Sequence, residues 1–285
     1  VIVGIDVYNV EAEALGCEVR YYGNNSIPGI VSHPFAGGVD AGSVEFSPEK
    51  GRIGMMLEAG RLIKDRVGDG VNVSIGICGP FSIYIELMGF EKAVEECNGN
   101  PEVVHEHLAA VLKFQECYCN EITERGLGIT VFESWASPPL ISPRLYREFA
   151  APYEKALISH IKRRGLSSVP LVIGGDTTAV IDDMIETGTT LLVADYSADP
   201  GVFIRKASER GLAVRGNIDP KLVHRGNKKE IIDGVKNILE KAKGCKKFIL
   251  GTGVIPYDTP VGNLLFVKEC LRDAERAVHP RQKEL

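Results

Sequence analysis

Residues 128–134 read Gly128-Ile-Thr-Val-Phe-Glu-Ser134, a short apolar run that ends abruptly in polar side chains. The run does not alternate apolar and polar residues, so it predicts a strand buried on both faces of a parallel sheet. The same pattern recurs in residues 1–6, 71–80, 170–176, 191–196, 212–219 and 248–253. The chain therefore contains a series of buried strands, each followed by polar residues at its carboxyl end.

Helical segments separate these strands along the chain. The spacing of apolar residues predicts helices over 48–67, 101–125, 142–164, 177–187, 200–210, 220–243 and 263–276. Ser142-Pro143 and Asp199-Pro200 each place a capping side chain before a proline that suits the first helical position. This repeated alternation of strand and helix predicts a parallel sheet with right-handed crossover connections.

The predicted fold class is α/β, in the form of a single (β/α)8 barrel over residues 1–285. No G-x-G-x-x-G or Walker A sequence opens the series, so an open nucleotide-binding sheet is less favoured. The segment 17–42 is rich in Gly, Tyr and Asn and does not fit the alternation, and we expect it to form an excursion over the barrel mouth. The chain begins with Val1 and not with Met, so we expect an amino-terminal segment to be missing.

The composition excludes several classes of protein. A net charge of −5 and a pI near 5.8 argue against a nucleic-acid-binding protein, which needs clustered Lys and Arg. No apolar run approaches the roughly 20 residues of a membrane-spanning helix. The seven cysteines are odd in number and scattered, which predicts a reduced, cytoplasmic enzyme.

Candidate site residues follow from the fold, because reactive groups in such barrels lie at the carboxyl ends of the strands. Glu133 and Trp135, the single tryptophan, are the strongest candidates, since both are costly to place after a buried strand without a partner or ligand. Asp176 follows two glycines, which let a ligand approach the backbone, but it can equally cap the next helix. The strand ends also offer possible substrate-binding residues, each of which can instead serve as a loop cap: Asp6, Tyr8, Asn9, Phe81, Asn217, Asp219 and Tyr257.

We assign no metal site. The pairs Cys117/Cys119 and His105/His107 fall in a helical pattern, where residues two positions apart point to different faces. Cys78 precedes Gly-Pro at a strand end, with no histidine nearby in sequence, and is interpreted as a small buried residue. His33, in a loop, is kept as the histidine of interest.

Several motifs, in order along nearly the whole chain, carry a resemblance to a known family. They are the Glu-Ala-Glu-Ala-Leu-Gly run at 11–16, Gly-Pro-Phe-Ser at 79–82, Phe-Glu-Ser-Trp at 132–135, Gly-Asp at 175–176, Gly-Asn-Ile-Asp-Pro at 216–220 and Leu-Gly-Thr-Gly at 250–253. With these motifs the chain resembles the uroporphyrinogen decarboxylase superfamily, closer to its corrinoid-linked methyltransferases of the methylcobalamin:coenzyme M type. The resemblance independently implies a (β/α)8 barrel.

The chain departs from both branches at diagnostic positions. Where the decarboxylases have a Tyr and a His, this sequence has Glu86 and Thr252, and its Asp6 lies one residue out of register with the family's Asp. A negative Glu86 would repel a polycarboxylate substrate. Where the thiol methyltransferases have His and Cys ligands for zinc, the chain has residues that cannot bind this metal, Val172, Gly174 and Val254.

What the resemblance implies is a corrinoid-linked methyltransferase that moves a methyl group between a small methylated donor, such as a methoxy compound, and a corrinoid carried by a partner protein. Removing a methyl group from an ether needs a general acid, for which Glu133 or Asp176 is the candidate. Tyr257 or Asn217 would orient the donor, and Trp135 or Phe81 would form an apolar wall. The alternatives are a decarboxylase of the uroporphyrinogen type and a barrel that binds a tetrapyrrole without catalysis.

Overall fold

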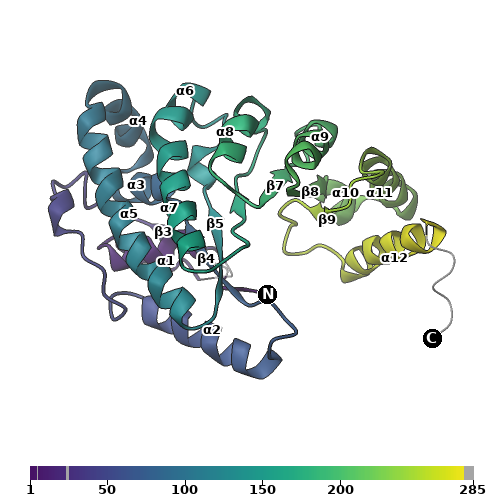
Figure 1. The fold of residues 1–285 in the computed structure, drawn as a ribbon, viewed down its shortest axis with the longest axis horizontal. Helices are drawn as coiled ribbons and strands as arrows, with labels where there is room; N and C mark the ends of the chain where they lie inside the picture. The colour runs from purple at the N-terminus through teal and green to yellow at the C-terminus, as the bar shows by residue number, and fades with distance from the viewer. Residues whose placement is uncertain (5, 24–25, 279–285) are drawn as a thin grey trace. The chain divides into compact units, whose positions relative to one another are not determined.

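The computed structural model describes residues 1–4, 6–23 and 26–278 (Figure 1). The chain divides into two compact units, the first formed by Val1–Gly174 with Ala179–Thr190 and the second by Gly175–Thr178 with Leu191–Leu285. The described part contains seven parallel strands, and each lies in one of the segments predicted from the sequence. The predicted α/β class is thereby confirmed.

The first unit is built on a parallel sheet of β1 (Ile2–Val3), β4 (Ser74–Cys78), β5 (Gly128–Phe132) and β6 (Leu171–Val172), in that order. Every residue of β4 is buried, as expected for a strand covered on both faces. In the parallel register Cys78 lies beside Phe132, so the residues that follow both strands leave the sheet at the same edge.

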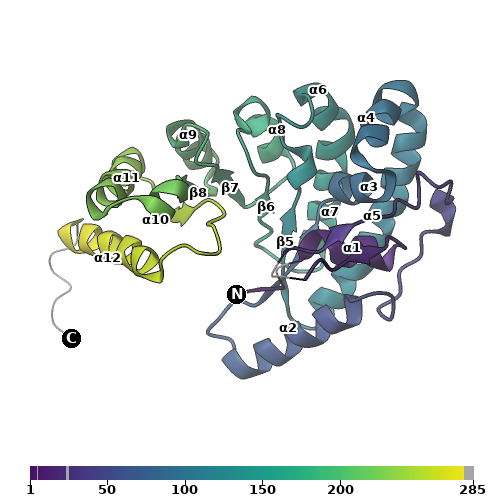
Figure 2. The same cartoon turned by 180° about the vertical axis from the view of Figure 1, so that it is seen from behind.

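Helices cover this sheet, and their bounds are α1 (Val7–Ala14), α2 (Ile53–Val67), α3 (Pro80–Met88), α4 (Phe90–Gly99), α5 (Pro101–Glu124), α6 (Pro143–Leu145), α7 (Ala151–Arg163) and α8 (Ile181–Glu186). Helices α5 and α7 run side by side in both views (Figures 1 and 2). The helix predicted over 142–164 contains a π-helical turn, Tyr146–Ala150, just before Pro152. Pro152 has no N–H, so it interrupts the regular α-helical hydrogen bonds there.

The sequence did not predict α1, α3 and α4. Every residue of α3 except Glu86 is buried, so this helix has no polar face that would reveal its period. Its position is set by Glu133, whose carboxyl accepts hydrogen bonds from the first N–H groups of the helix. Tyr8 and Asn9, predicted at a strand end, lie in the first turn of α1.

The segment 17–42 contains a small antiparallel pair, β2 (Val19–Arg20) and β3 (Gly29–Ile30), and a 3-10 turn, Ala41–Ser43. It is attached to the end of α3. Phe35 N donates to Leu87 O at 2.9 Å, and His33 Nδ1 lies 2.7 Å from Glu86 O. The excursion predicted from its composition therefore packs against the helix that carries Glu86.

The second unit contains a parallel sheet of β7 (Leu191–Ala194), β8 (Ala213–Ile218) and β9 (Phe248–Thr252). Its helices are α9 (Pro200–Arg210), α10 (Pro220–Arg225), α11 (Lys228–Lys241) and α12 (Val261–Val278). The predicted cap is present at α9, where Asp199 Oδ1 accepts from Gly201 N at 3.0 Å. The core between β8, α10 and α11 consists of Ile218, Val223, Ile231, Val235 and Ile238.

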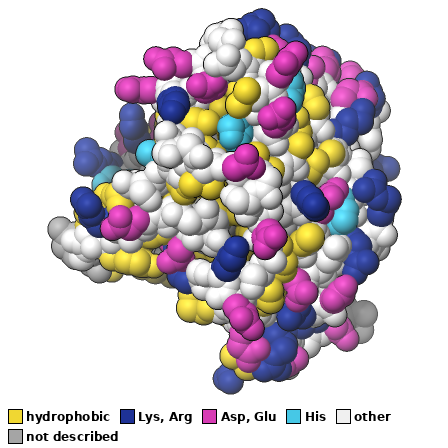
Figure 3. Space-filling view, turned by 90° about the vertical axis from the view of Figure 1, so that its left-hand side faces the viewer, with side chains coloured by type: hydrophobic (Ala, Val, Ile, Leu, Met, Phe, Trp, Pro, Cys, Tyr) yellow, Lys and Arg dark blue, Asp and Glu magenta, His cyan; other side chains and the backbone are white. Residues whose placement is uncertain are grey.

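Two further features of the molecule are its charged surface and the apolar character of its helices. On the face shown in Figure 3, basic and acidic side chains are interspersed. No helix in the described part of the chain has the length and apolar character needed to cross a membrane.

Candidate active site

Glu133 lies directly after β5, and its side chain is completely buried. Its Oε1 accepts a hydrogen bond from Ser82 N at 2.6 Å, and its Oε2 accepts one from Phe81 N at 3.3 Å. Burial raises the pKa of Glu133 to about 7, although these hydrogen bonds favour the ionised form. The carboxyl is therefore partly protonated at neutral pH.

Gly79 allows the Glu133 carboxyl to reach the helix. A Cβ atom at Gly79 would lie 2.0 Å from Glu133 Oε2, a distance that no real contact permits. The Gly-Pro-Phe-Ser motif thus supplies a turn narrow enough for the carboxyl and the free N–H groups that bind it.

Glu11 of α1 is a second buried carboxyl, only 1% exposed. Its Oε2 accepts from Cys78 N at 2.6 Å, and its Oε1 accepts from Gln115 Nε2 at 2.9 Å. Burial raises the pKa of Glu11 to about 8, and the charge of Glu133 contributes to the rise. This residue ties α1 and α5 to the end of β4.

Glu86 is the third carboxyl, and it is only partly buried. Its Oε1 accepts a hydrogen bond from Trp135 Nε1 at 2.7 Å. The indole ring of Trp135 is stacked on Phe90, with ring centroids 5.3 Å apart. Burial raises the pKa of Glu86, while the indole N–H and nearby His33 oppose that rise.

Tyr8 and Ser134 complete the group, because the Tyr8 hydroxyl is hydrogen-bonded to Ser134 Oγ. Burial raises the pKa of Tyr8, and the charges of Glu133 and Glu86 raise it further. The phenol therefore stays protonated over the physiological range. We call the following set the carboxyl cluster: Glu11, Glu86, Glu133, Tyr8, Ser134 and Trp135.

A fourth carboxyl, Glu154 of α7, lies close enough to Glu133 for the two charges to interact. It is completely buried, and the Tyr146 hydroxyl donates to its Oε2 at 2.6 Å. Burial and the charge of Glu133 hold the pKa of Glu154 well above its usual range.

None of these four glutamates forms an ion pair with Lys or Arg in the described part of the chain. Uncompensated carboxylates are costly to bury, so the group retains protons at neutral pH. Buried carboxyls whose pKa values are shifted by one another are typical of sites that transfer protons. Chemically, the arrangement can hold a proton and supply it to a bound molecule.

The other residues predicted in this unit have structural contacts. Asp6 is ion-paired with Arg52, whose Nη1 lies 2.6 Å from Asp6 Oδ2. Asn9 Nδ2 donates to Asp6 Oδ1 and, at 2.9 Å, to Pro28 O. Phe81 is fully buried, with its ring 6.2 Å from that of Tyr84. Asp6 and Asn9 therefore fix the start of α1, and Phe81 packs in the core.

The remaining predicted residues belong to the second unit. Asp176 is exposed and performs the capping role considered from the sequence, since its Oδ1 accepts from Thr178 N at 3.0 Å and from Thr178 Oγ1 at 2.5 Å. Tyr257 is 94% exposed. Arg215 of β8 donates to Asn217 Oδ1 at 3.0 Å and to Thr252 O at 3.1 Å.

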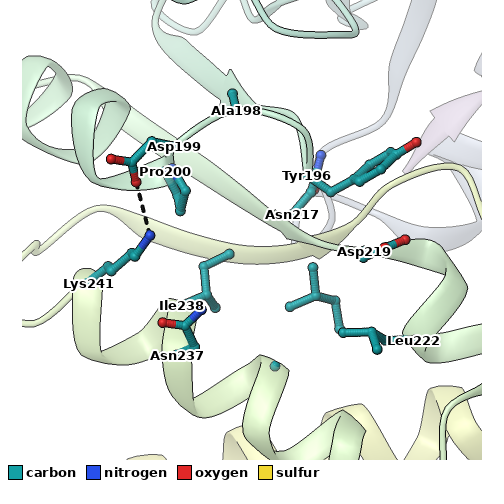
Figure 4. Close-up of a pocket in the computed structure, with 12 residues that line it drawn as sticks. Tyr196, Ala198, Asp199, Pro200, Asn217, Asp219, Leu222, Asn237, Ile238 and Lys241 are labelled. Carbon is teal, nitrogen blue, oxygen red and sulfur yellow. Dashed lines mark hydrogen bonds and ion pairs between the residues drawn. The ribbon is translucent and has the colours of Figure 1, made fainter.

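Asn217 and Asp219 line a cavity of about 320 Å³ in the second unit (Figure 4). Asp199 and Lys241, paired at 3.0 Å, lie on one side of it, and Tyr196 and Asp219 lie on the other. Asp219 Oδ1 also accepts from Lys221 N at 2.8 Å and thereby caps α10.

No group of three or more His, Cys, Asp or Glu side chains is arranged to hold a metal ion within the described ranges. Cys117, Cys119, His105 and His107 all lie on α5, as the periodicity predicted. His105 Nδ1 lies 2.9 Å from the hydroxyl of Tyr153.

Glu11 was not predicted from the sequence, and Glu86 was noted there only as a departure from a family pattern. Glu13, which also stands between apolar residues of this run, is partly exposed and ion-paired with Arg52, so the run itself does not single out Glu11. The partners of Glu11, Cys78 and Gln115, are 67 and 104 residues away in the chain, so sequence spacing does not reveal the cluster.

A family model for uroporphyrinogen decarboxylase (URO-D) matches residues 1–274 of this sequence. The chain belongs to the URO-D family. This confirms the resemblance drawn from the motifs.

Relatives within the URO-D family include both methyltransferases and decarboxylases. The methylcobamide:CoM methyltransferase MtbA of Methanosarcina acetivorans is 26% identical over 268 residues, which cover 92% of this chain and 76% of that protein. The MtbA of Methanosarcina mazei is 26% identical over 266 residues, with the same coverage of 92% and 76%. A uroporphyrinogen decarboxylase of Prochlorococcus marinus is 28% identical over 165 residues, which are 57% of this chain and 46% of that protein. These relatives confirm the prediction of an enzyme, and they favour a methyltransferase.

A solved structure of a methyltransferase from Methanosarcina mazei matches this chain with a TM-score of 0.83. The match covers 96% of this chain and 80% of that one, at 23% sequence identity. The match confirms the predicted α/β fold, which this chain shares with that methyltransferase.

Proposed function

We propose that this member of the URO-D family is a corrinoid-linked methyltransferase that moves a methyl group between a small methylated donor and a corrinoid. The two MtbA relatives, which match 92% of the chain, support this assignment. The corrinoid is the second substrate, carried by a partner protein, and it supplies the nucleophile that takes the methyl group.

The carboxyl cluster is the observation that carries the proposal. If the donor is a methoxy compound, its C–O bond breaks with the electron pair left on oxygen, and that oxygen takes up a proton. An acid that is still protonated at neutral pH makes this departure easier. Glu133 and Glu11, with pKa values of about 7 and about 8, keep protons in the cluster.

Glu133 is the carboxyl that we place in the catalytic machinery, and Asp176, exposed and engaged in capping Thr178, is the second candidate. Trp135 would offer its partly exposed indole as the apolar wall. Tyr8 would hold the donor by its phenol.

Decarboxylation of a porphyrinogen is the alternative, and the charges of the site weigh against it. An octacarboxylate needs cationic partners, whereas the carboxyl cluster has no Lys or Arg paired with it among the described residues. Arg52 is already bound to Asp6 and Glu13. Arg215 has no carboxylate partner in the described part, but one guanidinium does not match such a ligand.

The test is an anaerobic absorbance assay with Co(I) corrinoid, with and without a corrinoid protein, and a panel of methoxylated and N-methylated donors. We expect a loss of the Co(I) spectrum that depends on the donor. Glu133→Gln should slow it by about 100-fold or more, because the neutral amide can neither hold the proton of the cluster nor accept both N–H groups of α3. Glu49→Gln, at an exposed position, is the matched control and should have no effect. A flat trace with every donor and either form of corrinoid would refute the proposed function.

A further inference from the structure

We propose that Glu86 is the acid that contacts the methyl donor and protonates its departing oxygen, with Trp135 as its positioning residue. This inference rests on the proposed function and assigns the proton transfer within the same site. The sequence made Glu133 a candidate for the general acid, and we now assign the acid to Glu86 and a positioning role to Glu133.

Accessibility distinguishes the carboxyls of the cluster. Glu11 and Glu133 are 1% and 0% exposed, so neither can contact a bound molecule directly. Glu86 is the one residue of α3 that is not buried. A substrate at this site therefore reaches Glu86 before it reaches either of the other carboxyls.

Hydrogen bonding distinguishes them as well. Both oxygens of Glu133 are occupied by N–H groups of α3, at 2.6 and 3.3 Å. Glu86 uses only Oε1, which accepts from Trp135 Nε1 at 2.7 Å, and its Oε2 has no hydrogen-bond partner in the described part of the chain. One oxygen of Glu86 is thus anchored, and the other is available to a ligand.

Glu133 holds the Glu86–Trp135 pair in place through hydrogen bonds and does not contact the donor. It binds the N–H groups of Phe81 and Ser82, and Ser82 Oγ in turn accepts from Trp135 N at 3.1 Å. Through these bonds Glu133 fixes α3, which carries Glu86, against the turn that carries Trp135. We therefore describe Glu133 as a positioning residue of the same machinery.

Trp135 is rigidly held for its role. The stacking on Phe90, at 5.3 Å between centroids and 29° between ring planes, fixes the indole plane. Its N–H then points to one carboxyl oxygen of Glu86 and limits the rotation of that side chain.

A proton can return to Glu86 from solvent. The exposed His33 is anchored on the same residue, with its Nδ1 2.7 Å from Glu86 O, and it interacts with the Glu86 charge. In the transfer, the Co(I) corrinoid takes the methyl group as the C–O bond breaks, the Glu86 carboxyl gives its proton to the departing ether oxygen, and the carboxylate then regains a proton from water. The titratable groups that face Glu86 are Tyr8 of α1, Cys17 and His33 of the excursion, and Cys78 of β4.

The first test needs neither donor nor corrinoid. Trp135 is the only tryptophan of the chain, so its fluorescence reports the state of the carboxyl bound to its N–H. We expect one pH-dependent step in emission that Glu86→Gln abolishes and that Glu133→Gln and His33→Asn retain, shifted in pH. A step that survives in Glu86→Gln belongs to another group and would overturn the assignment.

The second test uses methoxybenzenes with graded leaving groups, from unsubstituted to 4-nitro, in the Co(I) assay. General acid catalysis matters most when the departing oxygen is most basic. Glu86→Gln should therefore lower the rate by about 100-fold for methoxybenzene and by less than about tenfold for the 4-nitro compound. An equal loss for both donors would assign Glu86 a structural role only.

The outcomes also separate this inference from the proposed function. If the wild-type chain transfers methyl groups and Glu86→Gln shows no dependence on the leaving group, the inference fails while the methyltransferase stands. If the wild-type chain transfers no methyl group from any donor, the proposed function fails and Glu86 loses its role with it. Trp135→Phe, which keeps a ring but removes the N–H, should reproduce part of the Glu86→Gln pattern.

Discussion

The close approach of Gly79 to Glu133 is the tightest constraint at the level of single residues. The backbone of Gly79 has an ordinary φ of −78°, so only space forbids a side chain there. In Gly79→Ala the new Cβ would meet the Glu133 carboxyl at 2.0 to 2.8 Å and push it away from the first turn of α3. We expect a loss of about 1 to 3 kcal/mol in unfolding free energy, measured by urea denaturation. Gly99→Ala, where no atom lies within 4 Å, is the control, and equal stabilities of the two variants would contradict the close approach.

The raised pKa of Glu11 predicts how the free energy of unfolding depends on pH. Its pKa is about 8 in the folded chain against an ordinary value of 4.5, so the folded state holds the proton more tightly. The stabilisation of the folded state by protonated Glu11 is complete below about pH 4.5, and it is lost as the pH rises through about 8. The difference between these two pKa values corresponds to at most roughly 4 to 5 kcal/mol of unfolding free energy.

Glu11→Gln should therefore flatten the decline in unfolding free energy between these pH values, as followed by denaturation at a series of pH values. Part of the decline should remain, because Glu133 and Glu154 titrate in the same direction. Glu49→Gln, which removes an exposed carboxyl, should leave the profile as it is. An unchanged profile in Glu11→Gln would show that Glu11 does not hold its proton at neutral pH.

At the level of elements, the amino end of α11 offers a clean test of capping. Asn227 Oδ1 accepts from Glu230 N at 3.0 Å, and Glu230 Oε2 accepts from Asn227 N at 2.8 Å, which together form a capping box. Asn227→Ala should cost about 1 kcal/mol of stability in thermal or urea unfolding. Asn227→Asp keeps the acceptor and should stay close to wild type. If the two variants lose equal stability, the cap does not contribute through this hydrogen bond.

The elements also show what the sequence can and cannot predict. The strands were predictable because each is a short apolar run bounded by polar residues. Helix α9 was predictable because Asp199-Pro200 is a recognisable helix N-cap and first residue. Helix α3 was not predictable, because apolar residues occupy all of its faces around Glu86 and leave no helical period in the sequence. A helix is recognised from its local pattern only when one face of it meets water, whereas a buried strand is recognised from its short apolar run.

The candidate site was predictable from the sequence only in part. Glu133 and Trp135 were predictable, because each is an unusual residue directly after a buried strand. Their partners were not, because Glu86 meets Trp135 across 49 positions of sequence. The sequence predicted which edge of the sheet carries chemistry, while the pairing of its residues depends on how α1 and α3 pack against that edge.

At the level of the whole molecule, membership of the URO-D family leaves two reactions to distinguish, methyl transfer and porphyrinogen decarboxylation. The negative charge of the chain and of its candidate site distinguishes between them. The chain carries a formal charge of −5, and its candidate site gathers glutamates that pair with no Lys or Arg among the described residues. A substrate with eight carboxylates would have to be desolvated beside these groups, which is unfavourable without cationic partners. A small neutral methyl donor meets no such penalty.

We therefore expect the full chain to leave uroporphyrinogen unchanged under anaerobic conditions, with chromatography of the oxidised porphyrins as the measurement. The same preparation should methylate Co(I) corrinoid from at least one donor, which demonstrates that the protein is active. Glu86→Gln removes one negative charge and should still give no decarboxylation, because it adds no cation. Products with fewer carboxyl groups from the wild-type chain would instead mean that the site binds polyanions despite its glutamates, and the methyltransferase proposal would then give way to decarboxylation.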